Sequence, residues 1–160
     1  MRLTHVTNHI KLNKYLLQTE KMTQNKTTHL FISTPTGVFF EGDVELVILS
    51  TISGGNITLM PNRTQFMSNI AVGKLLINSV GHPEHKVCAI GGGIVYADAK
   101  QIKIITDDIV YDKDIVLSWA EQQRDNALEH MKSATADEYA KYEAQLRKAI
   151  SKINIYNGQK

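Results

Sequence analysis

The chain has 160 residues, of which 42% are hydrophobic and 21% are charged, enough for one hydrophobic core and one small additional unit. A formal net charge of +2 is too small to indicate a nucleic-acid-binding protein. The single cysteine, Cys88, excludes an internal disulfide and fits a reducing compartment, and the longest apolar run, residues 44–49, is far shorter than the ~20 residues of a membrane-spanning helix.

Residues 1–27 carry a weak helical stripe at Leu12, Tyr15 and Leu16, which gives way to Thr, Gln, Asn and Lys. Polar terminal segments of this kind usually stay mobile. They contain no apolar core of ~7–15 residues, so we expect no signal peptide. We predict a flexible N-terminal arm that is dispensable for assembly.

Residues 28–108 alternate short apolar runs with turn residues. Gly, Pro, Asn and Asp separate the runs and favour turns for steric reasons. Leu30 and Ile32 point one way, as do Ile102 and Ile104, which suits one buried and one solvated face. The predicted strands are residues 30–33, 38–40, 44–49, 57–60, 74–78, 87–90, 93–97 and 101–106. This spacing predicts a β-sandwich or barrel.

Three consecutive glycines, Gly91 to Gly93, join two of the predicted strands. Glycine permits positive φ and close approach of the chain, as a sheet corner requires. A phosphate-binding glycine loop needs a helix directly after it, whereas residues 94–96 are strand-like. We therefore expect a corner of the sheet here and no nucleotide site.

After Thr106 the apolar period changes from two to about three and a half. Asp112 and Asp114 are predicted to cap a first helix with apolar positions at Val116, Ala120, Ala127 and Met131. Thr135 and Glu138 form a capping-box pattern. It opens a second helix with apolar positions at Tyr139, Tyr142, Leu146, Ala149 and Ile153. The short connection predicts an antiparallel hairpin over residues 112–156, followed by a tail, residues 157–160.

No group of side chains forms a catalytic constellation. His82 and His85 lie in a predicted turn without the further ligands of a zinc site. Asp107 and Asp108 follow a strand, where aspartate usually serves as a turn or cap residue. We expect no catalytic residue, no metal and no cofactor. The residues alone thus predict a binding or regulatory module, a β-sandwich with a helical hairpin attached.

Residues 29–156 resemble the ε subunit of bacterial F-type ATP synthase, called δ in mitochondria. The matching features follow the family's order and spacing over most of the chain. They are Pro35 and Gly37, residues 40–48, Gly55, Met60, Pro61, Gly73, residues 91–95 and 102–107, and Ala144, Leu146, Ala149, Ile153 and Ile155. The resemblance implies a β-sandwich followed by two α-helices, and a non-catalytic subunit of the rotor.

In this family the sandwich packs against the γ subunit and the membrane ring of c subunits. The hairpin either folds down on the sandwich or extends along γ, where its basic residues meet an acidic segment of a catalytic β subunit and block ATP hydrolysis. Arg147, Lys148 and Lys152 are the corresponding residues here. The resemblance also implies a cytoplasmic location, peripheral at the inner face of the membrane, while the small net charge indicates no nucleic-acid partner.

The loop that faces γ and the ring departs from the family pattern, which usually reads Gly-x-x-Gly-x-x-Pro-Gly-His-Ala-Pro. Thr58, Arg63 and Gln65 replace the second glycine, the histidine and the last proline. The predicted partner-binding residues of this region are Asn56, Met60, Pro61, Asn62 and Arg63. An F1-like ATPase that drives other mechanical work, such as surface motility, therefore stays an alternative. From another class, a free-standing sandwich adaptor explains the same core.

Some family members bind ATP between sandwich and hairpin through an Ile/Leu-Asp-x-x-Arg-Ala motif that opens the first helix. In this chain the aspartate position is Val116, the arginine position is Trp119, and a further arginine position is Asn126. The basic positions of the second helix are kept as Lys148 and Lys152. We predict that ATP binds weakly or not at all, and that Trp119 packs against the sandwich or γ.

Overall fold

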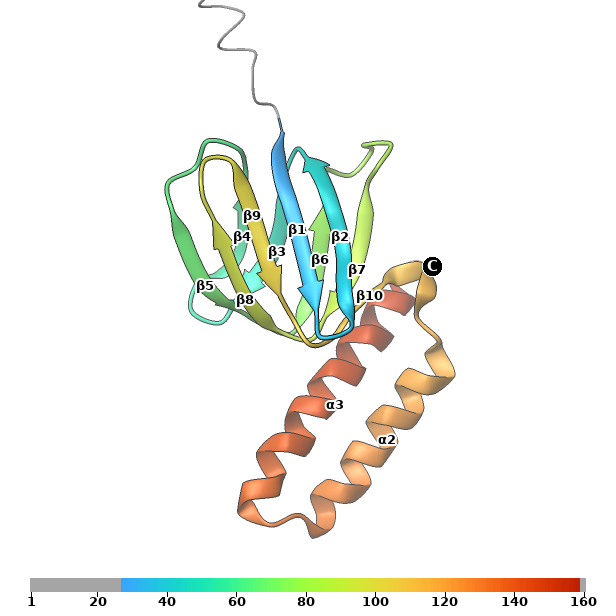
Figure 1. The fold of residues 1–160 in the computed structure, drawn as a ribbon. Helices are drawn as coiled ribbons and strands as arrows, with labels where there is room; N and C mark the ends of the chain where they lie inside the picture. Colours follow the sequence, from blue (N-terminus) through green and yellow to red (C-terminus); the bar gives the residue numbers. More distant parts are fainter. Residues whose placement is uncertain (1–26, 159–160) are drawn as a thin grey trace, which may run out of the picture.

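The computed structural model describes residues 27–158. The predicted N-terminal arm lies outside the described residues except for residue 27, and so do residues 159 and 160 of the predicted tail. Ten strands precede a 3₁₀ turn and two helices (Figure 1). The strands are β1 (Thr28–Thr34), β2 (Gly37–Val44), β3 (Val47–Thr51), β4 (Gly55–Leu59), β5 (Phe66–Ile70), β6 (Gly73–Ile77), β7 (Lys86–Ile90), β8 (Gly93–Ala97), β9 (Gln101–Ile105) and β10 (Ile109–Tyr111).

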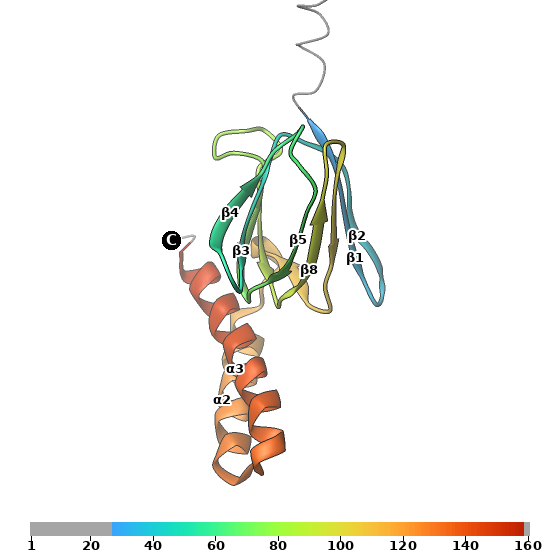
Figure 2. The same cartoon turned by 90° about the vertical axis from the view of Figure 1, so that its left-hand side faces the viewer.

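The strands form one hydrogen-bonded sheet in the order β10-β7-β6-β3-β5-β8-β9-β1-β2, with β4 paired to β3. The pairing of β1 with β9 is parallel, and the other pairings are antiparallel. The sheet folds into two facing layers, with β3 and β4 on one side and β1, β2 and β8 on the other (Figure 2). Phe39 of β2 stacks on Tyr111 of β10 at 4.5 Å between ring centroids, so the two ends of the strand order meet.

The core lies between these layers and is built from alternate residues of the strands. Leu30, Ile32, Ile102 and Ile104 are fully buried, which confirms the predicted alternation. The core also contains Val44, Val47, Leu49, Leu59, Ile70, Leu75, Ile77, Cys88, Ile90, Val95 and Ala97. The predicted β-sandwich is confirmed.

The structure differs from the predicted strands at three places. Strand β5 was not predicted, because its sequence FMSNI mixes Ser and Asn with apolar residues. The run 44–49 is not one strand but the end of β2 and the start of β3. The buried Asn78 stabilises the break between the two strands. Its side-chain Oδ1 accepts a hydrogen bond from the Glu45 backbone N–H at 2.8 Å, and its backbone N–H donates to the Leu46 carbonyl at 2.9 Å. The sheet also continues to Tyr111, beyond residue 108, because β10 pairs with β7.

Two antiparallel helices follow, α2 (Leu117–Ser133) and α3 (Ala136–Asn157), as predicted (Figure 1). The predicted caps of the first helix are wrong. Asp112 and Asp114 belong to a separate 3₁₀ turn, η1 (Asp112–Asp114), and Val116 precedes α2 without a side-chain cap. At the start of α3, the Thr135 amide donates to Glu138 Oε2 at 3.1 Å, the return bond of the predicted capping box.

The hairpin projects from one end of the sandwich and does not lie along its faces (Figures 1 and 2). A small second cluster joins the two parts. Its buried residues are Ala89 of β7, Ile115 directly after η1, and Ile155 of α3, and Val87, Val110 and Tyr156 pack against them. None of the helices in the described part of the chain is long and apolar enough to cross a membrane.

Candidate partner-binding surfaces

Four of the five loop residues predicted to bind partners lie together. Met60, Pro61, Asn62 and Arg63 follow β4 at the end of the sandwich opposite the hairpin (Figure 2). Asn62 has φ of 60°, which Asn tolerates, and its amide donates to the Ala99 carbonyl of the β8–β9 turn at 3.1 Å. The Arg63 guanidinium lies 4.5 Å from the centroid of the Phe66 ring. The loop therefore presents an exposed methionine and a fixed cation at the tip of the sandwich.

Asn56, the fifth predicted residue, does not join this group. It lies at the other end of β4, paired with Ser50 and hydrogen-bonded to the Ser50 hydroxyl. Thr51, the next residue of β3, borders a groove beside α3. The five predicted residues thus divide between the two ends of the sandwich, because β4 runs the length of the sandwich between them.

An exposed apolar row crosses the outside of the sheet and was not predicted. The register aligns Ile94 of β8 with Ile105 of β9, Ile105 with Ser33 of β1, and Ser33 with Val38 of β2. Ile105 is 64% exposed, and Met67 of the neighbouring β5 is 71% exposed. We call Val38, Met67, Ile94 and Ile105 the outer apolar face. Consecutive apolar residues such as Ile104 and Ile105 are the sequence signal for it, since only one of the two can face the core.

The three basic residues predicted to contact β are all paired within this chain. Lys148 Nζ lies 2.9 Å from Asp107 Oδ2, and Lys152 Nζ lies 3.0 Å from Asp108 Oδ2. Arg147 pairs along its own helix with Glu143 at 2.6 Å. The hydrogen bond from Lys148 lowers the pKa of Asp107. Asp107 and Asp108 are thus ion-pair partners of the hairpin, a role that the predicted turn or cap did not include.

A polar groove of about 610 Å³ lies between these ion pairs and the two helices. Asn126 faces it together with His130, Tyr142, Lys148 and Lys152. Val116 and Trp119 do not line this groove; they border a smaller hollow near the start of α2. Trp119 is 69% exposed, so its predicted packing against the sandwich is wrong, and packing against a γ subunit stays a prediction.

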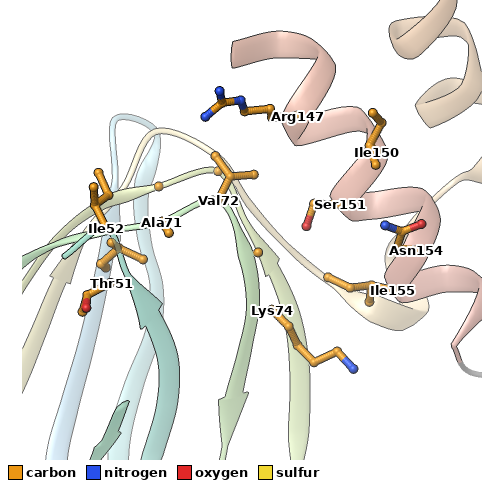
Figure 3. Close-up of a pocket in the computed structure, with 14 residues that line it drawn as sticks. Thr51, Ile52, Ala71, Val72, Lys74, Arg147, Ile150, Ser151, Asn154 and Ile155 are labelled. Atoms are coloured by element: carbon orange, nitrogen blue, oxygen red, sulfur yellow. The ribbon is translucent and has the colours of Figure 1, made fainter. Parts of the chain in front are cut away.

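A larger groove, of about 900 Å³, separates α3 from the turns at the adjacent end of the sandwich. Figure 3 shows Ile52 and Val72 on the sandwich side, and Ile150 and Ser151 on the helix side. Arg147 and Lys74 lie toward its rims (Figure 3). The groove thus leaves a gap between this face of α3 and the adjacent turns of the sandwich.

The glycine corner fixes the loop that carries the two aspartates. The Gly91 amide donates to the Asp108 carbonyl at 2.7 Å, and the Thr106 hydroxyl donates to the Gly92 carbonyl at 2.6 Å. Gly93 has φ of 136°, and a Cβ there would lie 2.2 Å from the Ile105 carbonyl oxygen. The predicted sheet corner is present, and only glycine fits its last position.

Comparison with known proteins identifies the family. The family model described as "ATP synthase, Delta/Epsilon chain, beta-sandwich domain" matches residues 27–112. An ATP synthase epsilon chain of Mycoplasma mobile is 36% identical over 85% of this chain and 96% of its own length. One of Mycoplasmopsis pulmonis is 31% identical over 79% of this chain and 90% of its own. The chain belongs to the ATP synthase delta/epsilon family, which confirms the resemblance.

Solved structures share the fold at low sequence identity. A chain in the Euglena gracilis mitochondrial ATP synthase, in a structure comprising OSCP, F1 and c-ring, superposes with a TM-score of 0.63 at 15% identity, covering 76% of each chain. A chain in the central stalk and c-ring structure of Tetrahymena thermophila mitochondrial ATP synthase gives 0.52 at 16% identity, covering 86% of this chain and 98% of that one. At this identity the likeness concerns the fold.

Proposed function

We propose that this chain is the ε subunit of a rotary F-type ATP synthase, a non-catalytic component of the central stalk that links a γ subunit to the membrane ring and regulates ATP hydrolysis. One observation carries the proposal: relatives named ATP synthase epsilon chain align over nearly their whole length with both the sandwich and the hairpin. The complex would hold the chain at the cytoplasmic, inner face of the membrane.

The outer apolar face is the surface that we assign to γ. Exposed apolar residues that gather on one face of a sheet are typical of a protein interface, because water contact with such a patch is unfavourable. The loop with Met60 and Arg63 lies at the tip of the sandwich and is assigned to the ring end. A face and a tip allow the sandwich to contact two partners at once.

The hairpin is assigned to regulation. It is joined to the sandwich by one small apolar cluster and two ion pairs, so a second position costs little buried surface. Regulated segments commonly combine few contacts with two alternative packings. In its released position the hairpin would bring Arg147, Lys148 and Lys152 to an acidic segment of β, where opposite charges favour binding.

Affinity purification of the tagged chain from its native cells, followed by mass spectrometry, tests the partners. We expect α, β, γ and c subunits. Ile94→Glu with Ile105→Glu should reduce γ recovery at least tenfold, whereas Lys74→Glu on β6, a strand that is not part of the outer apolar face, should retain it. Recovery of the head without c subunits would contradict coupling to a membrane ring and favour an ATPase that drives other mechanical work. Recovery of no ATPase subunit would favour the free-standing adaptor.

The brake is tested by substitution of its charges. Arg147→Ala, Lys148→Ala and Lys152→Ala together should raise ATP hydrolysis by the assembled complex, because each change removes attraction to the acidic segment. Lys141→Ala on the same helix is the matched control and should leave the rate unchanged. If the triple variant hydrolyses ATP at the wild-type rate, the hairpin has no braking role.

A further inference from the structure

Two lysines of α3 reach across from the hairpin to adjacent aspartates of the sandwich. Lys148 pairs with Asp107 at 2.9 Å, and Lys152 pairs with Asp108 at 3.0 Å. The lysine side chains are only 24% and 18% exposed. The pairs join residues 41 and 44 positions apart, on two separate parts of the molecule. They therefore fix the position of the hairpin and not merely the local shape of a helix.

The stem of Lys148 packs against a glycine. A Cβ added at Gly91 would lie 2.9 Å from Lys148 Cε and 2.8 Å from Asp108 Cβ. Any larger residue would displace the lysine stem or the aspartate. Gly91 thus leaves the space through which the lysine reaches the sandwich.

The backbone of the loop that carries the two aspartates is held by hydrogen bonds that do not involve the lysines. The Asp108 carbonyl accepts from the Gly91 amide at 2.7 Å, and the Thr106 hydroxyl donates to the Gly92 carbonyl at 2.6 Å. A loop whose backbone is already fixed loses less conformational entropy on pairing, and lost entropy is one of the costs of an exposed ion pair. Another face of α3 borders the groove of about 900 Å³ in Figure 3, so the ion pairs hold the helix where a gap separates it from the sandwich.

We propose that Asp107 and Asp108 form an internal competitor for the regulatory lysines. The two carboxylates hold Lys148 and Lys152 on the sandwich, and an acidic segment of a partner engages the same lysines only after both ion pairs open. The partner half of this inference rests on the proposed function; the ion-pair latch itself does not. The latch keeps the brake off by occupying the groups that would apply it.

Salt should weaken the latch, chiefly at the Asp107 pair, because the Asp107 side chain is 67% exposed. Electrostatic attraction is screened over about 8 Å at physiological ionic strength and over about 3 Å at 1 M. High salt should therefore loosen the hairpin without unfolding the sandwich, whose core is apolar. If the apolar cluster at Ile115 and Ile155 alone held the hairpin, the position of the hairpin would not depend on salt in this way.

Distance measurement between spin labels on the full chain tests the latch. Labels at Ser79→Cys and Ser133→Cys mark the sandwich and the hairpin turn, while the native Cys88 is buried and does not compete for the label. We expect one narrow distance in the wild type and a broad or second population with Asp107→Asn and Asp108→Asn, or in 1 M salt. Asp114→Asn, an exposed carboxylate outside the two pairs, is the control.

Two further variants separate charge from packing. Gly91→Leu keeps every charge but fills the path of Lys148, and it should broaden the distance as well. Exchange of the charges, with both aspartates changed to Lys and both lysines to Asp, should restore the narrow distance. A wild-type distance in the double asparagine variant at physiological salt would overturn the latch.

Hydrolysis by the assembled complex then tests the competition. Asp107→Asn with Asp108→Asn should lower the rate several-fold, because the lysines are released, whereas Lys148→Ala with Lys152→Ala should raise it. These opposite signs are not expected from general loss of stability. If the distances change as expected but hydrolysis stays constant in all variants, the latch stands and the proposed brake fails.

Discussion

ATP should bind only weakly to the polar groove between the hairpin and the sandwich. Its volume of about 610 Å³ lies within the range of small-molecule sites, ~300–1,000 Å³, so size does not decide the matter. Charge decides it. Lys148 and Lys152 line the groove but already pair with Asp107 and Asp108 at 2.9 and 3.0 Å. A triphosphate would have to displace two carboxylates and tolerate them nearby.

The expected loss of ATP affinity follows from the contacts that this chain lacks. ATP-binding members of the family use charged residues at three positions, of which Asn126 lines the groove, whereas Val116 and Trp119 border the adjoining hollow that shares Gln123 and Lys152 with it. A hydrogen bond to a charged group contributes roughly 1.5–3 kcal/mol, so a ligand that spans groove and hollow loses about 4 kcal/mol with two of these contacts. That is about a thousandfold in affinity and turns a micromolar dissociation constant into a millimolar one.

The assay uses the single tryptophan. Trp119 is 69% exposed and lies beside a hollow that shares Gln123 and Lys152 with the groove, so its fluorescence should report occupancy. Titration of the isolated chain with ATP, followed by fluorescence and calorimetry, should give no saturable signal below about 1 mM. The double variant Asp107→Asn and Asp108→Asn provides a comparison in which both lysines are free. A micromolar dissociation constant for the wild type would refute the reasoning.

Three other predictions follow from single positions. Gly93→Ala should destabilise the chain by at least about 2 kcal/mol in urea unfolding, since it adds strain at positive φ; Gly73→Ala, with open space at Cβ, should stay near the wild type. The hydrogen bond from Lys148 lowers the pKa of Asp107 from 3.8, so that ion pair is complete above this value and is lost as pH falls through the lowered pKa. The label distance should then stay constant from about pH 5 to 8, and a shift near neutrality would contradict this. Burial raises the pKa of Cys88 to about 12, so a thiol reagent should react only with the unfolded chain.

Local patterns in the sequence were sufficient for much of the fold. The alternation at Leu30 and Ile32 predicts the buried face, and Thr135 with Glu138 predicts the start of α3, because both signals involve residues close in the chain. The break between β2 and β3 could not be found this way. It depends on Asn78, which is 33 residues from Glu45 in the chain.

The candidate sites could likewise be predicted where their residues are close in the chain, and not where they are far apart. Met60 to Arg63 are adjacent in sequence and therefore stay together, whereas Asn56 lies across the length of a strand from them. The aspartates that pair with Lys148 and Lys152 are more than 40 residues away in the chain. The sequence therefore showed that the two lysines are basic but not that they form ion pairs within the chain. The outer apolar face needs the register of β8, β9, β1 and β2 before its residues align.

The sandwich should fold without the hairpin, because its main core contains no residue beyond Tyr111. Truncation after Asp112 keeps β10, which pairs with β7, and removes Ile115 and Ile155 from the second cluster. Full burial of one such side chain contributes ~1.5–3 kcal/mol, so loss of the cluster weakens the attachment of the hairpin but leaves the larger core intact.

We therefore expect cooperative urea unfolding of the truncated chain, monitored by circular dichroism, and retained binding to γ through the outer apolar face. ATP hydrolysis by the complex should rise above the wild-type rate, because truncation removes the lysines together with their latch. A chain that ends at Gly158 is the control and should behave as the full length. Failure of the truncated chain to fold would show that the second cluster is part of the sandwich's own core. Normal folding with an unchanged hydrolysis rate would leave the hairpin a structural role only.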